Sequence, residues 1–261
     1  MKKVIGGSIA VACITVVAAS AAADEKCADF LNSNAQPTPI KEAYKLVASI
    51  PDKKDEFETT KNFKLRRAHA IQEVLAKLRE KEKSGTIFLS QKVKSYAWKY
   101  DADREELSLP DWALDEVPFG RSIIGVRHLN GTDGYSYNLL QEDTETTYVG
   151  ANAFGAKKQI RKIDATFYGI YLTPGSMPKK IPFLRIRTPM PDAKQIAKDG
   201  AASILFGINI ESPYRLMDVG HRDATFSDPI EYYFTNYYIV SSLRCSILYN
   251  DVTNKTLYTM K

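Results

Sequence analysis

A serine and a lysine three residues apart could form a catalytic pair. Ser176 and Lys179 match the S-x-x-K spacing that places a nucleophilic serine beside a lysine base in penicillin-recognising enzymes. That chemistry requires both residues on one helical turn, whereas Pro178, with Pro174 and Gly175 close before it, indicates a loop. The S-D-N and K-T-G motifs of those enzymes are absent from the sequence. We therefore expect no catalytic role for this pair.

The histidines and one acidic stretch are the other residues suited to catalysis or metal binding. His69, His128 and His221 are far apart in the sequence, and we place them on a long helix, a strand and a loop respectively. Acidic residues alternate at 101–105, as oxygen ligands of Ca²⁺ can, but an EF-hand loop needs a further acidic position and a glycine. The sequence therefore predicts surface or hydrogen-bonded histidines, a solvated turn, no metal site, no cofactor and no catalytic residue.

One aromatic group stands out as a candidate contact surface. Tyrosine and phenylalanine anchor protein interfaces, so an exposed cluster would form a binding site. The same residues also suit core and strand-edge packing, which is the favoured interpretation of the pattern alone. The candidate binding residues are Tyr232, Tyr233, Phe234, Tyr237 and Tyr238.

The first 23 residues have the pattern of a secretory signal peptide. Lys2 and Lys3 precede the apolar run Val4–Ala19, and small residues follow up to Ala23. The alternative is an N-terminal membrane anchor, but the run is short and rich in alanine and glycine. We expect cleavage after Ala23, giving a mature chain that begins at Asp24.

The basic start of this segment is typical of bacteria, so the periplasm or the medium is the expected location. The residues just before Cys27 are charged, which excludes a lipidation motif. Loss of Lys2 and Lys3 lowers the count of Lys and Arg from 36 to 34, against 31 Asp and Glu, so the formal charge falls from +5 to +3. A weak and evenly spread charge gives no indication of nucleic-acid binding.

Two cysteines remain after removal of the segment that contains Cys13. An oxidising compartment permits a disulfide between Cys27 and Cys245, the only intrachain pairing available. The alternative for Cys245 is a buried free thiol, because it falls on the apolar side of a strand pattern.

A long helix is the strongest periodic signal. We predict it from Thr60 to Lys83, with Gly85 suited to the position after its end and a shorter helix at Ile40–Ile50 before it. An apolar stripe of this length requires a partner, and the downstream strands are the only one large enough. The stripe comprises Phe63, Ala68, Ile71, Val74, Leu75 and Leu78.

From Thr86 onward the pattern changes to a period of two, which predicts strands. A short helix at Pro191–Asp199, followed by Gly200, interrupts them. In Tyr237–Tyr249 the odd-numbered apolar residues are expected on one face. The predicted strands are Thr86–Gln91, Val93–Tyr100, Glu105–Leu109, Ser122–Leu129, Tyr135–Leu140, Thr146–Gly150, Ile163–Leu172, Pro182–Thr188, Ser203–Glu211, Tyr237–Tyr249 and Thr256–Met260.

These elements predict an α+β fold in which N-terminal helices pack on a mainly antiparallel sheet. We expect one mature globular unit over residues 24–261, with a helical layer at 24–85 and a β-rich part at 86–261. No internal repeat and no further segment of membrane-spanning length is present in the sequence.

Several short motifs resemble a broad group of uncharacterised bacterial exported proteins. The resemblance covers most of the mature chain and implies a fold type and a compartment, with no catalytic residue carried over. The motifs are Asp55-Glu56-Phe57-Glu58-Thr59-Thr60 with Phe63, Tyr100-Asp101-Ala102-Asp103, Asn152-Ala153-Phe154-Gly155, the Pro191 helix leading to Phe206-Gly207, and a final Tyr249-Asn250-Asp251 hairpin.

The sequence therefore favours an exported envelope protein that binds an envelope protein or ligand and does not catalyse. One alternative is an exported hydrolase whose site is assembled only in three dimensions. A secreted effector is the other.

Overall fold

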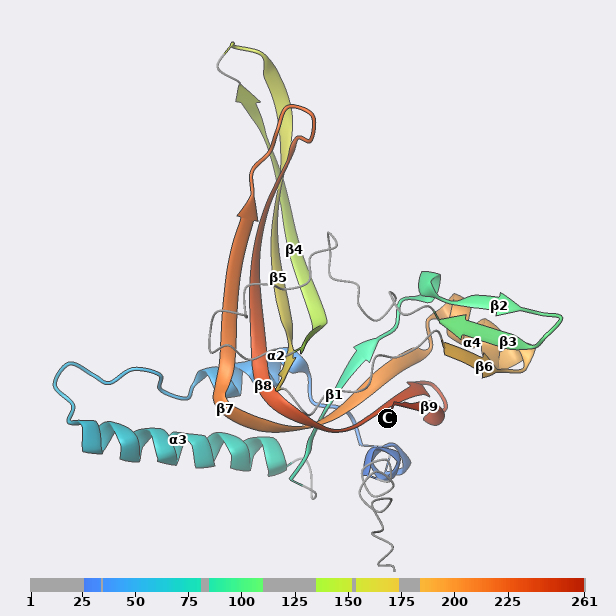
Figure 1. Cartoon of the computed structure of the whole chain (residues 1–261), viewed down its shortest axis with the longest axis horizontal. Coiled ribbons are helices and arrows are strands. Elements are labelled where there is room, and N and C mark those ends of the chain that lie inside the picture. Colours follow the sequence, from blue (N-terminus) through green and yellow to red (C-terminus); the bar gives the residue numbers. More distant parts are fainter. Residues whose placement is uncertain are drawn as a thin grey trace, which may run out of the picture.

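The computed structural model describes residues 26–33, 35–80, 85–109, 135–151, 154–173 and 184–260. These residues form several helices and a large mixed sheet, which confirms the α+β fold class (Figure 1). Some predictions lie outside the described residues: the signal peptide at 1–23, the strand at 122–129, His128, and the pair Ser176 and Lys179.

The main sheet is built around two long central strands. Its order is β1-β7-β8-β5-β4, and β9 pairs with β8 beyond the end of β5. β5 and β8 are parallel, and all other neighbours are antiparallel. The strands are β1 (Ile87–Lys92), β4 (Tyr135–Ala151), β5 (Lys157–Leu172), β7 (Ala202–Arg222), β8 (Ile230–Asn250) and β9 (Lys255–Met260).

Strands β7 and β8 divide this sheet into a body and an arm. In the body, residues 202–210 of β7 and 241–250 of β8 pair with each other and with β1 and β9. In the arm, residues 215–222 of β7 and 230–240 of β8 continue beside β5 and β4. β7 and β8 have 21 residues each, a strand length of about 70 Å. The arm therefore stands out from the body (Figure 1).

The structure has one strand, β4, where the sequence predicted two, Tyr135–Leu140 and Thr146–Gly150. Every residue from 141 to 149 is exposed. With neither face of this stretch in a core, apolar residues do not alternate along it, and the periodic signal is lost. Threonines at 144, 146 and 147 nevertheless favour an extended backbone.

The body sheet carries a hydrophobic core on each of its faces. One core contains Ile204, Phe206 and Ile208 of β7 and residues of the helices, as the predicted alternation of Ser203–Glu211 requires. The smaller core, on the opposite face, contains Phe88, Leu205, Cys245, Ile247 and Tyr249.

A bulge in β8 explains why the second core was not foreseen. Gly207 pairs with Cys245 whereas Ile208 pairs with Leu243, so Arg244 is an extra residue. Residues after Arg244 consequently change face. The prediction that the odd-numbered residues of Tyr237–Tyr249 share one face is therefore wrong beyond Leu243.

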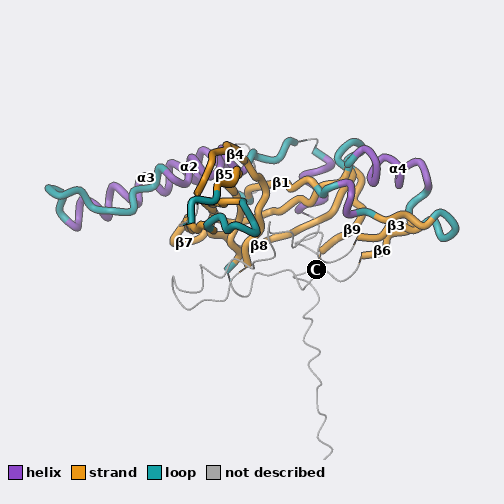
Figure 2. Tube along the Cα trace, turned by 90° about the horizontal axis from the view of Figure 1, so that it is seen from above, coloured by secondary structure: helices purple, strands orange, loops and turns teal. Residues whose placement is uncertain are grey.

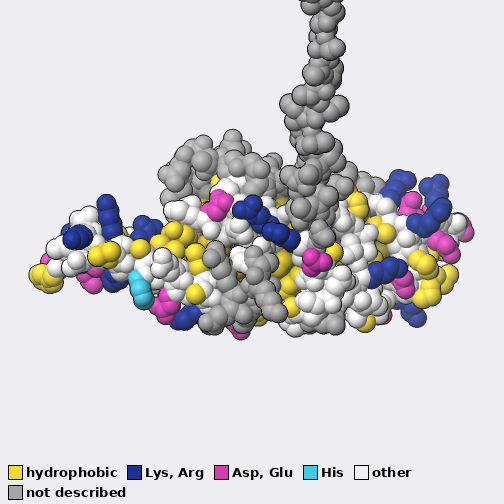
Figure 3. All heavy atoms as spheres, turned by 90° about the horizontal axis from the view of Figure 1, so that it is seen from below, with side chains coloured by type: hydrophobic (Ala, Val, Ile, Leu, Met, Phe, Trp, Pro, Cys, Tyr) yellow, Lys and Arg dark blue, Asp and Glu magenta, His cyan; other side chains and the backbone are white. Residues whose placement is uncertain are grey.

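Helix α2 (Ile40–Ala48) makes the direct contact between the N-terminal helices and the sheet. Its Ala43, Tyr44 and Val47 are buried, and it touches β4, β5, β7 and β8. The long helix α3 (Thr60–Glu80) packs mainly against α2 and extends beyond the body (Figures 1 and 3). Val74 and Leu78 of α3 are buried, whereas Leu75 is half-buried and Ala68 is exposed. The predicted stripe is thus covered only near its C-terminal end.

A second sheet of three strands lies at the other end of the molecule, together with α4 (Met190–Asp199) (Figure 2). Gly200 caps α4 in the left-handed conformation, φ 65°, as its position predicted. The predicted strand Val93–Tyr100 is wrong, because the short helix η1 (Ser95–Ala97) exposes Tyr96 while Trp98 is buried. The strands are β2 (Lys99–Asp101), β3 (Glu106–Leu109) and β6 (Leu184–Arg187).

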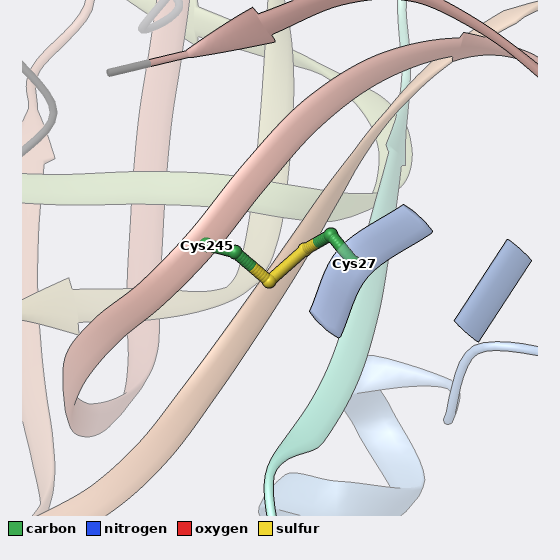
Figure 4. The surroundings of a disulfide bond; sticks show 2 residues. All are labelled: Cys27 and Cys245. Atoms are coloured by element: carbon green, nitrogen blue, oxygen red, sulfur yellow. A yellow bond between two sulfur atoms is a disulfide. The ribbon is translucent and has the colours of Figure 1, made fainter. Parts of the chain in front are cut away.

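A disulfide joins Cys27 to Cys245 and fixes a short N-terminal helix, residues 26–32, to the body (Figure 4). The Cα atoms of the two cysteines are 6.0 Å apart. Beside the bond, the ring of Phe30 stacks on that of Phe88 with centroids 4.2 Å apart. The helix therefore covers the smaller core of the body.

Candidate binding surface on the arm

The pleat of β8 distributes the five candidate aromatic residues between the two faces of the arm. Tyr233 and Tyr237 lie on the face that α2 covers at its base, since the ring of Tyr237 contacts Tyr44 of α2. Tyr232, Phe234 and Tyr238 point to the opposite face, where Tyr238 has no exposed surface and Tyr232 is 6% exposed. The five rings therefore do not form one surface, and among them Tyr233 is the most accessible, at 37%.

Tyr233 is held in a cross-strand stack on the α2 face. The Lys162 ammonium on β5 lies 4.7 Å from the centroid of the ring. The His221 ring on β7, the strand partner of Tyr233, is nearly parallel to it with centroids 5.9 Å apart. Neighbours on both adjacent strands thus restrict the motion of the ring. Binding through its exposed edge would therefore cost little conformational entropy.

The Glu231 carboxylate fixes a second ring beside this stack. It accepts hydrogen bonds from the hydroxyls of Tyr233, at 2.8 Å, and Tyr148 of β4, at 3.0 Å. These hydrogen bonds are the main reason that the pKa of each phenol lies above its usual value. Asp164 balances the charge of Lys162, with Nζ and Oδ2 3.6 Å apart. The region therefore carries little net charge, a single excess negative charge on Glu231, and is preorganised across four strands.

The base of the same face is closed by α2. Tyr44 packs its ring against those of Tyr168 and Tyr237, with centroids 5.8 and 5.0 Å away. Burial raises the pKa of Tyr44. Tyr237 is therefore a packing residue of the α2 junction, and the accessible surface begins beyond it, toward the far end of the arm.

Polar contacts of two basic residues complete this junction. Arg215 of β7 donates to the Asp52 carboxylate and to the carbonyl of Ala48, the last residue of α2. Lys41 pairs with Glu142 at 2.6 Å. These contacts fix α2 to both edge strands of the arm.

Exposed aliphatic side chains extend the surface toward β7. Met217 and Val219 alternate with Asp218 and are 58% and 62% exposed. Together with the Tyr233 stack they form a mixed aliphatic and aromatic area, with polar groups at its centre. We call this area the arm surface, made of Tyr148, Lys162, Met217, Val219, His221, Glu231 and Tyr233.

A serine, an aspartate and a lysine, residue types that can form a catalytic site, lie close together elsewhere, at the end of the body sheet. Asp251 accepts a hydrogen bond from the hydroxyl of Ser203, at 2.9 Å, and one from Lys92, at 2.6 Å. Ser203 is only 4% exposed. The ammonium of Lys92 is engaged by Asp251 and not by the serine. We interpret the group as fastening the turn after β8 to β1 and β7.

The remaining candidates also have structural explanations. Asp101 accepts hydrogen bonds from the amides of Asp103 and Arg104, which makes the acidic stretch a side-chain-stabilised turn. His69 is exposed on α3, and His221 is on β7, where the sequence predicted a loop. Within the described ranges no group of three or more His, Cys, Asp or Glu could hold a metal ion.

No protein-family model, curated protein or solved structure matches this chain. In the part of the chain that the structure describes, no helix is both long and apolar enough to cross a membrane.

Sequence reasoning found Tyr233 and missed its neighbours. Tyr148, Lys162 and His221 come from three other strands, and nothing in the sequence gives the register that brings them together. The usable signal was the period of two in β8, which separates Tyr233 and Tyr237 from the other three candidates.

Proposed function

We propose that this is an exported bacterial envelope protein that binds another protein through the arm surface and catalyses no reaction. The observation that carries the proposal is the preorganised Tyr233 stack beside exposed Met217 and Val219, on an arm that stands away from the body. The signal-peptide pattern of residues 1–23 and the Cys27–Cys245 bond support an oxidising, extracytoplasmic location.

The chemistry of the arm surface favours a protein partner over a sugar or a nucleobase. Stacking on a flat ligand requires a free ring face, whereas Lys162 and His221, from the two neighbouring strands, both pack against the Tyr233 ring. What remains is a ring edge, two phenol groups and aliphatic side chains. Protein interfaces combine such rigid aromatic anchors with aliphatic contacts, at little net charge.

Site-specific photo-crosslinking tests the proposal. A photoreactive residue at Val219 should capture a defined envelope protein. The matched control is Val252, which is 64% exposed in the turn between β8 and β9, away from the arm, and should capture little. Tyr233→Ala should weaken capture about tenfold or more and leave the melting temperature nearly unchanged, because the ring is an interface anchor outside the core. Equal capture from both positions, or none from Val219, would overturn the assignment of the surface.

Export is tested on its own. The protein recovered from the periplasm or medium should have the intact mass of a chain that begins within a residue or two of Asp24. Retention of Lys2 and Lys3 in the protein of that fraction would contradict the proposed cleavage of a signal peptide.

A further inference from the structure

The outer edge of β7 in the arm is an open strand edge. Over residues 215–221, β7 pairs with β8 on one side, and no strand of the described residues lies on the other side. Figure 1 shows β7 at the border of the arm. An edge strand offers its backbone N–H and C=O groups to a further strand. The side chains along this edge therefore indicate which strand would pair there.

The arm surface has two different halves along this edge. Toward the base of the arm, β7 presents the exposed aliphatic side chains of Met217 and Val219. Toward the tip it presents His221, whose ring stacks on that of Tyr233. The three β7 residues share one face because they alternate along the strand. A twofold rotation about Val219 brings the aliphatic half of one copy onto the aromatic half of another, and the reverse. The surface is thus complementary to itself.

We propose that the partner of the arm surface is a second copy of this chain, paired antiparallel along β7 with Val219 on the twofold axis. Met217 of each copy then faces His221 of the other, where its thioether contacts the stacked rings. The two arms join into one continuous sheet through an isologous contact, the type that a twofold dimer requires. The inference rests on the proposed function, because it names the partner of the same surface.

The pairing rules of antiparallel strands select this register. Because outward-pointing backbone groups alternate along β7, the axis must pass through a residue position and not between two. An axis at Asp218 would oppose two carboxylates. An axis at Gly220 places no side chain at the centre and sets Met217 against Asp223, beyond the end of the strand. An axis at Met217 would extend the ladder into the register shift before residue 215. Val219 is the position that avoids all three.

The charges along the edge are compatible with this register. Arg215 faces Asp223 of the second copy, which is an opposite-charge pair at each end of the contact. Asp218 faces Gly220 of the second copy, so no like charges stand directly opposite each other. Arg215 already binds Asp52 of its own chain, and the five N–H donors of a guanidinium allow both contacts.

Sedimentation equilibrium of the chain from Asp24 onward, which contains every described residue, tests for the dimer. The unchanged protein should approach twice the monomer mass as its concentration rises. Val219→Lys opposes two ammonium groups on the axis and should weaken dimerisation about tenfold or more. The matched control, Val252→Lys, changes a similarly exposed valine away from the arm and should dimerise as the unchanged protein does. Both variants should keep the melting temperature of the dilute protein, because both valines are exposed.

Engineered cysteines test the register. Val219→Cys faces its own copy across the axis and should form an intermolecular disulfide under mild oxidation. Met217→Cys should crosslink poorly with itself but readily when mixed with His221→Cys. Val252→Cys should not crosslink under the same conditions.

The proposal is overturned if the unchanged protein stays monomeric at every concentration, or if Val219→Lys dimerises equally well. It is also overturned if Met217→Cys crosslinks with itself as readily as with His221→Cys. The photoreactive residue at Val219 separates this inference from the proposed function. Capture of a second copy supports both, and capture of a different protein by a chain that is monomeric when purified overturns this inference alone. Capture of nothing overturns both.

Discussion

Replacing both Cys27 and Cys245 with serine should destabilise the protein by about 5 kcal/mol at most. The two residues are separated by 218 positions, and closing a loop of this length removes about 5 kcal/mol of chain entropy from the unfolded state. The bond also holds the helix at 26–32 over the smaller core. Part of the loss should therefore appear as exposure of that core.

A mutant cycle separates the two contributions. Phe30→Ala keeps the bond but removes the ring that stacks on Phe88, and should cost about 3–5 kcal/mol in the intact protein. If the bond keeps the helix docked, Phe30→Ala should cost much less in the double-serine background. The difference is the coupling energy between the bond and the packing.

Urea unfolding monitored by circular dichroism measures all four proteins, and thiol titration checks the bond. The denatured, unreduced chain from Asp24 onward should show no free thiol. Two titratable thiols would mean that the bond does not form. Equal unfolding free energies for the unchanged and double-serine proteins, within about 1 kcal/mol, would refute the stabilising role assigned to it.

Three further predictions follow from burial and hydrogen bonding. Leu78→Ala should cost about 2–5 kcal/mol in urea unfolding, the half-buried Leu75→Ala clearly less, and His69→Ala almost nothing; equal effects would mean that α3 does not pack as described. Burial raises the pKa of Tyr232 from 10.0 to about 12, so the contribution of its neutral phenol is complete below pH 10 and is lost as pH rises through 12. Tyr232→Phe should therefore lose less stability over that interval in pH-dependent melting. Ser203→Ala should leave any hydrolytic signal on ester, peptide, glycoside and phosphoester panels unchanged; a turnover that this variant abolishes, with the fold intact, would favour the hydrolase alternative.

The elements that could be predicted have their determinants close together in the sequence. Helix α4 combines Pro191 in its first turn with Gly200 at its end, and each signal acts within a few residues. The body part of β7 has one face in the large core, so Ile204, Phe206 and Ile208 alternate as a half-buried strand requires.

The elements that could not be predicted depend on partners distant in the sequence. The middle of β4 has no buried face and therefore no alternation, although it forms one continuous strand with β5 as its partner. The bulge at Arg244 changes the face of the residues after it, and the sequence contains no sign of one extra residue. The neighbours of Tyr233 come from other strands. Of the arm surface, the sequence therefore predicted only Tyr233, as one of five candidate residues.

The two edges of the arm differ in a way that supports binding on one side. An exposed edge strand invites pairing, and proteins protect such edges with charge. On β4, Glu142 and Glu145 lie at the edge and pair with Lys41 and Arg161. The β7 edge also carries charge, on Arg215 and Arg222, but among the described residues it presents exposed Met217 and Val219 beside the Tyr233 stack.

Exposed apolar side chains on an edge strand favour association, and Met217 and Val219 beside a preorganised ring are most simply explained by a partner that covers them. That partner would approach the side of the arm, along β7.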